Sequence, residues 1–205
     1  MSRLFLFDVD STLINEEVID LIAKHAGVAE QVKKITELAM SGEIDFDTAL
    51  TSRVALLTGL PTTVLDSVRN EISLTNGASE VIAQLQDNGD QIAVVSGGFL
   101  EVITPLMQSL AISYFKANSL EIASGKLTGK VQGAVVNRGA KAAYLKQLQN
   151  QLQPSQTIAI GDGANDIEMV EAADIGIAFC AKNALKEIAD IAIDIRDLRE
   201  ILKFI

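Results

Sequence analysis

Short apolar runs alternate along the chain with longer stretches whose apolar residues recur at helical spacing. The runs LFLF, IAVV, TIAI and IGIAF lack the polar alternation of a half-exposed strand. Uninterrupted apolar runs are typical of strands that helices cover on both faces, as in a parallel sheet. They predict strands over 4–7, 92–95, 157–160 and 175–179. The alternation predicts an α/β fold with a doubly wound parallel sheet.

The segment between the first two predicted strands is far longer than one crossover helix requires. It contains no strand-like run up to about Asn70, and its apolar residues are spaced as on amphipathic helices. We therefore expect a helical cap domain over 15–74, inserted into a core made of 1–14 and 75–205.

Glycines indicate where further helices and strands begin and end in the rest of the chain. Gly77 and Gly89 are expected to begin and end a helix that leads back to the sheet. The glycine spacing within 114–136 predicts a hairpin or two short strands beside the main sheet. A further helix is expected from about Gly139 to Leu152, before a proline.

The charge balance argues against one class of partner. The formal net charge is −10 and no long stretch clusters lysine and arginine, so nucleic acid is not expected to bind. The N-terminus is too polar for a signal peptide or a membrane span, which predicts a cytoplasmic protein without membrane contact. The single cysteine, Cys180, is expected to be a buried, inert thiol, and the single histidine, His25, to be solvated.

Two carboxylates follow the first predicted strand. In an open parallel sheet, ligands bind outside the carboxyl ends of the strands. Asp8 ends the first strand and Asp10 lies two residues further on. One carboxylate of such a pair can attack phosphorus while the other, kept protonated, gives a proton to the leaving oxygen. Taken alone, the pair could instead cap the next helix.

Other strand ends bring polar groups to the same edge. Asp162 and Asp166 in GDGANDIEM follow a predicted strand, and their oxygens suit magnesium. A dinucleotide site is disfavoured because Asp166 stands where GxGxxG has its third glycine. Ser96 and Gly97 in SGGF form either an anion site at a strand-to-helix turn or a simple tight turn. Lys141 alone is uninformative.

These residues, in this order, resemble the four motifs of the haloacid dehalogenase superfamily of phosphatases. The motif residues are Asp8, Asp10, Ser96, Lys141, Asp162 and Asp166. EEVID, AMSGEIDF, SRVALLTGLP, AFCAK and RDLREILK look like the phosphoserine phosphatase branch. The resemblance implies hydrolysis of O-phospho-L-serine to L-serine and phosphate through an aspartyl phosphate, the last step of serine biosynthesis. The sequence departs from the family pattern at Val9, because family members most often carry an aromatic residue between the two aspartates. The Val9 side chain is expected to point away from the site.

The resemblance also implies catalytic and metal-binding roles. Asp8 would be the nucleophile, Asp10 the acid and then the base, and Lys141 would neutralise the phosphoaspartate. Mg²⁺ would be held by Asp8, Asp162 and the Asp10 carbonyl, with Asp166 supporting that shell.

Further residues are implied to bind the phosphate side of the substrate. Ser96 and the Gly97 amide would contact phosphate oxygens, together with Asn165. Met40 and Phe46 of the cap would shield the site from water.

Two charged residues of the cap are expected to determine which substrate binds. Glu17 would bind the substrate ammonium and Arg53 its carboxylate, although both could instead be a surface pair on neighbouring helices. The alternatives are a related phosphatase or phosphotransferase for another small phosphomonoester, such as phosphohomoserine, and a non-catalytic phospho-acceptor domain. The expected partner is a small phosphomonoester, and the chain could be a monomer or a homodimer.

Overall fold

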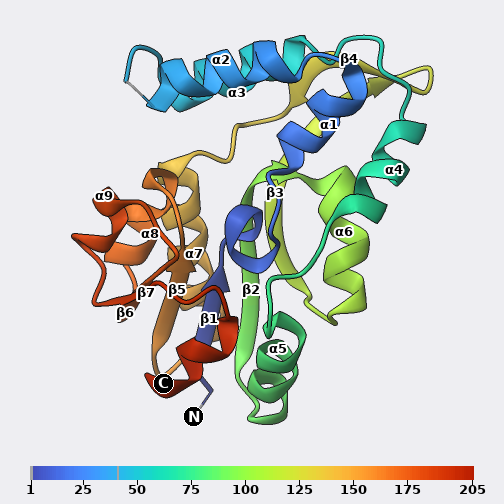
Figure 1. The fold of residues 1–205 in the computed structure, drawn as a ribbon. Coiled ribbons are helices and arrows are strands. Elements are labelled where there is room, and N and C mark those ends of the chain that lie inside the picture. The colour runs from blue at the N-terminus through green and yellow to red at the C-terminus, as the bar shows by residue number, and fades with distance from the viewer. Residues whose placement is uncertain (1, 41) are drawn as a thin grey trace.

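A central sheet carries helices on both faces, with further helices beyond one end of its strands (Figure 1). The computed structural model describes residues 2–40 and 42–205. Over these residues the sheet has seven strands in the order β4-β3-β2-β1-β5-β6-β7. Neighbouring strands are parallel except for β3 and β4. The strands are β1 (Leu4–Phe7), β2 (Gln91–Phe99), β3 (Tyr114–Ala123), β4 (Lys126–Gln132), β5 (Thr157–Gly161), β6 (Ile175–Phe179) and β7 (Ile191–Ile193).

Both faces of the sheet are buried, in two separate cores. Phe5 and Phe7 of β1 belong to one core, and Leu4 and Leu6 to the other, because successive side chains of a strand point to opposite faces. The first core is covered by α5 (Ala78–Asp87), α6 (Leu100–Ser109) and the C-terminal turn Leu198–Lys203. The second is covered by α7 (Arg138–Leu152), α8 (Ile167–Glu171) and α9 (Asn183–Lys186). The predicted α/β fold is confirmed.

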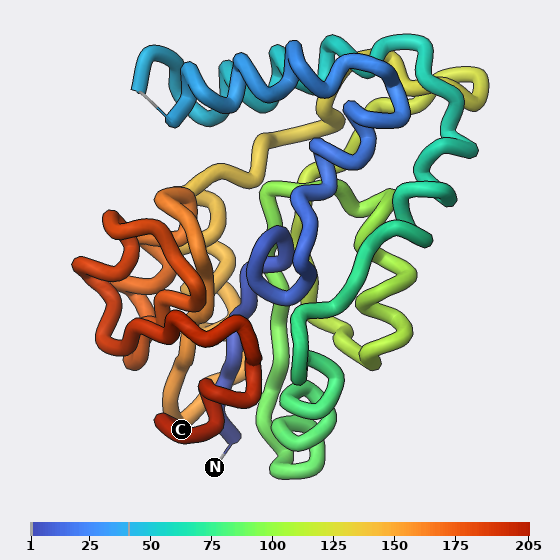
Figure 2. The backbone as a smooth tube through the Cα atoms, in the orientation of Figure 1, coloured from blue at the N-terminus to red at the C-terminus, as the bar shows by residue number. Residues whose placement is uncertain are grey.

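The helical insertion between β1 and α5 is also confirmed. Its members, called the cap helices below, are α1 (Val18–Ala26), α2 (Ala29–Met40), α3 (Phe46–Ala55) and α4 (Thr63–Glu71). They lie beyond the carboxyl end of β1 (Figure 2). The hairpin of β3 and β4 supports them, since the Gly59 amide donates to the Leu127 carbonyl at 2.8 Å. The division into a 15–74 cap domain and a core of 1–14 and 75–205 stays a prediction.

Several local expectations needed revision. The strand predicted over 92–95 continues through Phe99, so the expected turn at SGGF is extended backbone leading directly into α6. The hairpin strands are part of the main sheet, since Ala93 of β2 pairs with Tyr114 of β3. The short strand β7 was not predicted. Gly77 and Gly89 do flank α5, and both have positive φ, where glycine is favoured.

Two side chains differ from the environments expected for them. The Cys180 thiol is only half-buried, and this partial burial raises its pKa. His25 is not merely solvated, because its Nε2 lies 2.5 Å from Oε1 of Glu71. Val9 is fully buried in the core, which confirms that it points away from the strand-end carboxylates. Within the described ranges, no helix has the length and apolar character needed to cross a membrane.

Candidate active site

The parallel register places the carboxyl ends of β1, β2 and β5 side by side at one edge of the sheet. Phe7, the last residue of β1, pairs with Val94 of β2 and Ile160 of β5. Asp8 follows immediately, and its amide donates to the Ile160 carbonyl at 2.9 Å, so the chain remains beside β5 as it leaves the strand. It then turns through Val9–Leu13, which places Asp10 beyond the strand end as expected.

Lys141 lies between two aspartates at this edge. Its Nζ donates to Oδ1 of Asp8 and to Oδ1 of Asp166, both at 2.6 Å, and all three side chains are almost fully buried. Burial lowers the pKa of Lys141, but the charges of Asp166 and Asp8 outweigh it and hold that pKa above its usual value. Lys141 is therefore a fixed cation beside Asp8.

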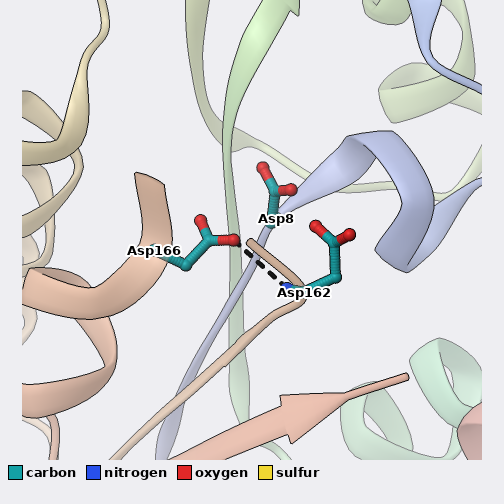
Figure 3. A group of neighbouring side chains, drawn as sticks. All are labelled: Asp8, Asp162 and Asp166. Atoms are coloured by element: carbon teal, nitrogen blue, oxygen red, sulfur yellow. Dashed lines mark hydrogen bonds between the residues drawn. The ribbon is translucent and has the colours of Figure 1, made fainter. Parts of the chain in front are cut away.

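Asp8, Asp162 and Asp166 form an acidic cluster (Figure 3). One oxygen from each lies within 4.8 Å of the others. Oδ2 of Asp166 accepts hydrogen bonds from the amides of Asp162 and Gly163 at 3.2 and 3.1 Å. Burial and then the charge of Asp166 raise the pKa of Asp162 to about 7. Three converging carboxylates near one ammonium group repel one another, and a small divalent cation would relieve that repulsion.

The donor set therefore fits a hard cation such as Mg²⁺, with unequal contributions from the predicted ligands. Asp8 and Asp162 offer oxygens directly. Asp166 already uses both oxygens in bonds to Lys141 and to backbone amides, which suits support of the metal shell. The side chain of Asp10 lies outside the cluster, so its carbonyl is the group left for the predicted role.

Asp10 is suited to carry a proton. Burial, and next the charge of Glu17, raise its pKa well above the usual value of an aspartate. Its Oδ1 is buried with no hydrogen-bond partner among the described residues. A Cβ at Gly98 would lie 3.2 Å from this carboxyl and 3.0 Å from Oγ of Ser96, which explains the glycine there. A carboxyl that stays protonated near neutral pH can act as a general acid.

A cavity of about 490 Å³ lies between these aspartates and the cap helices. Its walls include Asp8, Asp10, Asp162 and the predicted substrate-binding residues Glu17, Met40, Phe46, Arg53, Gly97 and Asn165. Ser96, Lys141 and Asp166 do not line it and are fully buried. Lys141 and Asp166 hold groups that do line it, Asp8 and the Asp162 amide, whereas Ser96 is bonded to the amide of Gly98, next to the lining residue Gly97. The structure thus gathers the predicted residues around one cavity.

Hydrogen bonds orient both charged cap residues. Oε1 of Glu17 accepts a hydrogen bond from the Ser11 hydroxyl at 2.7 Å. The half-buried Arg53 donates from Nε to the Ala49 carbonyl at 3.2 Å and from Nη1 to Oγ1 of Thr36 at 3.3 Å. Both side chains line the cavity, with Glu17 exposed and Arg53 half-buried.

The two predicted shielding residues differ in position. The ring of Phe46 lies over Gly97, only 3.4 Å from where a Cβ of that residue would stand. Met40 is 64% exposed, and its Sδ lies 4.0 Å from Nζ of Lys182 at the cavity rim. Phe46 therefore covers the backbone at Gly97, whereas Met40 is largely open to solvent.

Sequence reasoning missed three polar residues of the cavity wall, Asp20, Thr36 and Lys182. Asp20 lies three positions after Glu17 on α1, so helical spacing could have placed both on one face. Lys182 follows β6 and could have been found by the strand-end rule. Thr36 offered no signal, because only the packing of α2 on α3 brings it to Arg53.

Buried carboxylates at strand ends, a bridging lysine and a helical cap define a haloacid dehalogenase-like hydrolase, and the model of that family matches residues 5–171. The chain belongs to this family. It is 50% identical to a phosphoserine phosphatase of Lactococcus lactis, over 98% of this chain and 94% of that protein. It is 48% identical to one from Methanocaldococcus jannaschii, over 99% of this chain and 97% of that protein.

Solved structures show the same similarity. A phospho-aspartyl intermediate analogue of phosphoserine phosphatase has a TM-score of 0.94 and 48% identity, over 100% of this chain and 99% of the other. A substrate-bound phosphoserine phosphatase complex has a TM-score of 0.95 and 47% identity, with the same coverage.

Proposed function

We propose that this protein is a phosphoserine phosphatase, which hydrolyses O-phospho-L-serine to L-serine and phosphate in the last step of serine biosynthesis. One observation carries the proposal: Asp8 and Asp10 at the end of β1 line the same cavity as the inserted segment's Arg53 and Glu17, which are charges of opposite sign. The similarity to phosphoserine phosphatases over nearly the whole chain supports the assignment. We place the activity in the cytoplasm.

In the first half-reaction, an oxygen of Asp8 attacks phosphorus as the bond from phosphorus to the serine oxygen breaks. Asp10 gives its proton to that oxygen, which leaves as the hydroxyl of serine. The burial of the Asp10 carboxyl, which raises its pKa well above the usual value, supports this role. In the second half-reaction, a water oxygen attacks phosphorus, the bond to Asp8 breaks, and Asp10 takes a proton from the water.

An acidic site can bind an anionic phosphate only if positive charges nearby offset the repulsion between the carboxylates and the phosphate. Lys141 supplies one fixed charge at 2.6 Å from Asp8. Asp8, Asp162 and the Asp10 carbonyl would hold Mg²⁺, which when bound neutralises phosphate oxygens and developing charge. Asp166 would keep Lys141 and the Asp162 loop in position.

The remaining residues would bind the substrate. The Gly97 amide, the Ser96 hydroxyl and Asn165 would contact phosphate, beneath the ring of Phe46. The Oγ of Ser96 accepts from the Gly98 amide at 2.7 Å, so the hydroxyl proton remains available to donate to a phosphate oxygen. Met40, whose Sδ already lies 4.0 Å from Nζ of Lys182, would shield the cavity from the side of the cap helices.

Two residues of opposite charge in the inserted segment would bind the ammonium and carboxylate groups of the substrate. Arg53 would bind the carboxylate and Glu17 the ammonium, because a guanidinium fork matches a carboxylate and a carboxylate matches an ammonium. A simple aryl phosphate such as p-nitrophenyl phosphate presents neither group.

A panel of phosphomonoesters tests the proposal. We expect kcat/KM to be highest for phosphoserine and lower for phosphohomoserine, phosphothreonine and an aryl phosphate. Rapid acid quenching during turnover of ³²P-labelled phosphoserine should trap label on Asp8. A higher kcat/KM for another phosphomonoester would identify that compound as the substrate instead. Transfer of label to an added alcohol in preference to water would identify the enzyme as a phosphotransferase.

A further inference from the structure

A hydrogen bond joins the cap helices to the helix that carries Lys141. Nδ2 of Asn137 donates to Oδ1 and Oδ2 of Asp47 at 3.0 and 3.2 Å. Asp47 lies in the first turn of α3, and Asn137 immediately precedes α7. In Figure 1 this end of α3 lies on the α7 side of the molecule, away from α1 and α4. The bond therefore ties down the end of the cap that is remote from its linkers.

On the core side, Asn137 is already fixed by its own helix. Its Oδ1 accepts from the Ala140 amide at 3.1 Å, which makes it the N-cap of α7. Its carbonyl accepts from the Lys141 amide at 3.0 Å, so the residue that reaches Asp47 also anchors the backbone of the bridging lysine. With its oxygen used for capping, the amide can offer only Nδ2 to the cap helices.

On the cap side, Asp47 follows the residue that covers the phosphate site. Phe46 lies over Gly97, and Leu50 and Arg53 of the same helix also line the cavity. The Asp47 side chain is exposed and belongs to none of these contacts with the cavity. A tether at Asp47 thus acts on the position of α3 and, through it, on the ring above Gly97.

We infer that the Asp47–Asn137 hydrogen bond positions the cap helices over the active site, with both residues acting as positioning residues. Neither touches the substrate. This inference rests on the proposed phosphatase chemistry, but it does not depend on which phosphomonoester is the substrate.

An exchange of the two side chains tests it. Asn137→Asp keeps an acceptor for the Ala140 amide, and so keeps the helix cap, but sets a carboxylate against Asp47. Adding Asp47→Asn restores one amide and one carboxylate with their places exchanged. Asn150→Asp, on the exposed end of the same helix, makes the same change of charge away from the cap.

The position of the cap can be followed without turnover. The chain has no tryptophan and two tyrosines, so Phe46→Trp introduces a single tryptophan above Gly97 that can be excited selectively. In that background, Asn137→Asp should increase acrylamide quenching, and the exchange should return it to the parent value. Asn150→Asp should leave it unchanged.

Catalysis should follow the same pattern with Phe46 intact. Repulsion between exposed carboxylates and loss of the hydrogen bond should lower kcat/KM about tenfold for phosphoserine and an aryl phosphate alike. The loss should shrink at high salt, which screens exposed charges, and the exchange should recover most of it. Chemical unfolding should show similar stability for both variants.

Two results would overturn the inference: unchanged quenching and kinetics in Asn137→Asp, or a loss that Asp47→Asn does not repair. A loss explained by a lower unfolding midpoint would assign the bond to stability instead. If the phosphoserine assignment alone is wrong, acrylamide quenching and the kcat/KM for an aryl phosphate still measure the effect of the Asp47–Asn137 hydrogen bond.

Discussion

Replacing Arg53 by alanine is the sharpest test of substrate recognition. Arg53 is half-buried in the cavity wall, and its guanidinium is held by two neutral oxygens, from Ala49 and Thr36. Burial lowers its pKa while the charge of Asp20 opposes that shift, and an arginine stays protonated at neutral pH. Arg53 is therefore a cation that forms no ion pair with a carboxylate of the described residues, as binding of an anionic substrate group requires.

The size of the effect follows from this burial. Truncating one partner of a desolvated charge pair costs about 2 to 5 kcal/mol, and a half-buried side chain belongs at the lower end. A loss of about 2 kcal/mol corresponds to about thirtyfold in kcat/KM. Arg53→Lys keeps the charge but loses the planar fork, so its loss should lie between those of wild type and Arg53→Ala.

Steady-state kinetics on two substrates provide the measurement. Phosphoserine should lose about thirtyfold in kcat/KM, by the estimate above, whereas an aryl phosphate without carboxylate or ammonium should lose less than about twofold. Lys34→Ala, an exposed cation of α2, controls for the change of net charge. Equal losses on both substrates in Arg53→Ala would refute carboxylate recognition and assign Arg53 to the fold or to the position of the cap helices.

Further outcomes concern the nucleophile and the metal. Asp8→Asn should keep the fold, as judged by circular dichroism, and abolish turnover because an amide is not a nucleophile here; a folded variant with substantial hydrolysis would remove the covalent step. EDTA should stop turnover and Mg²⁺ restore it, so full activity in excess chelator would exclude the metal. In the folded, metal-free protein the Asp162 pKa of about 7 lies above the usual aspartate value of 3.8, so protonation favours the folded state. Stability should therefore fall as pH rises from about 4 to about 7, and Mg²⁺ should raise the unfolding midpoint more at pH 8 than at pH 5; an equal gain at both values would contradict this.

The fold could be predicted because its signals are local. A strand buried on both faces must be apolar throughout, as LFLF and TIAI are, and helices must repeat their apolar residues at helical spacing. Boundaries were less certain. The strand β7 has only three residues, and SGGF continues β2 because pairing with β3 extends it, which no local residue preference indicates.

Much of the site could likewise be predicted, because parallel strands end at one edge of a sheet and so bring Asp8, Ser96 and Asp162 together. The sequence determined which chemical groups are present and on which strand ends they stand. Only the tertiary structure decided how they are charged and held. Lys141 is far from Asp8 in the chain yet lies 2.6 Å from it, and burial raises the pKa of Asp10. Desolvation and contacts between distant segments exist only once the chain has packed, and they give these carboxylates their different properties.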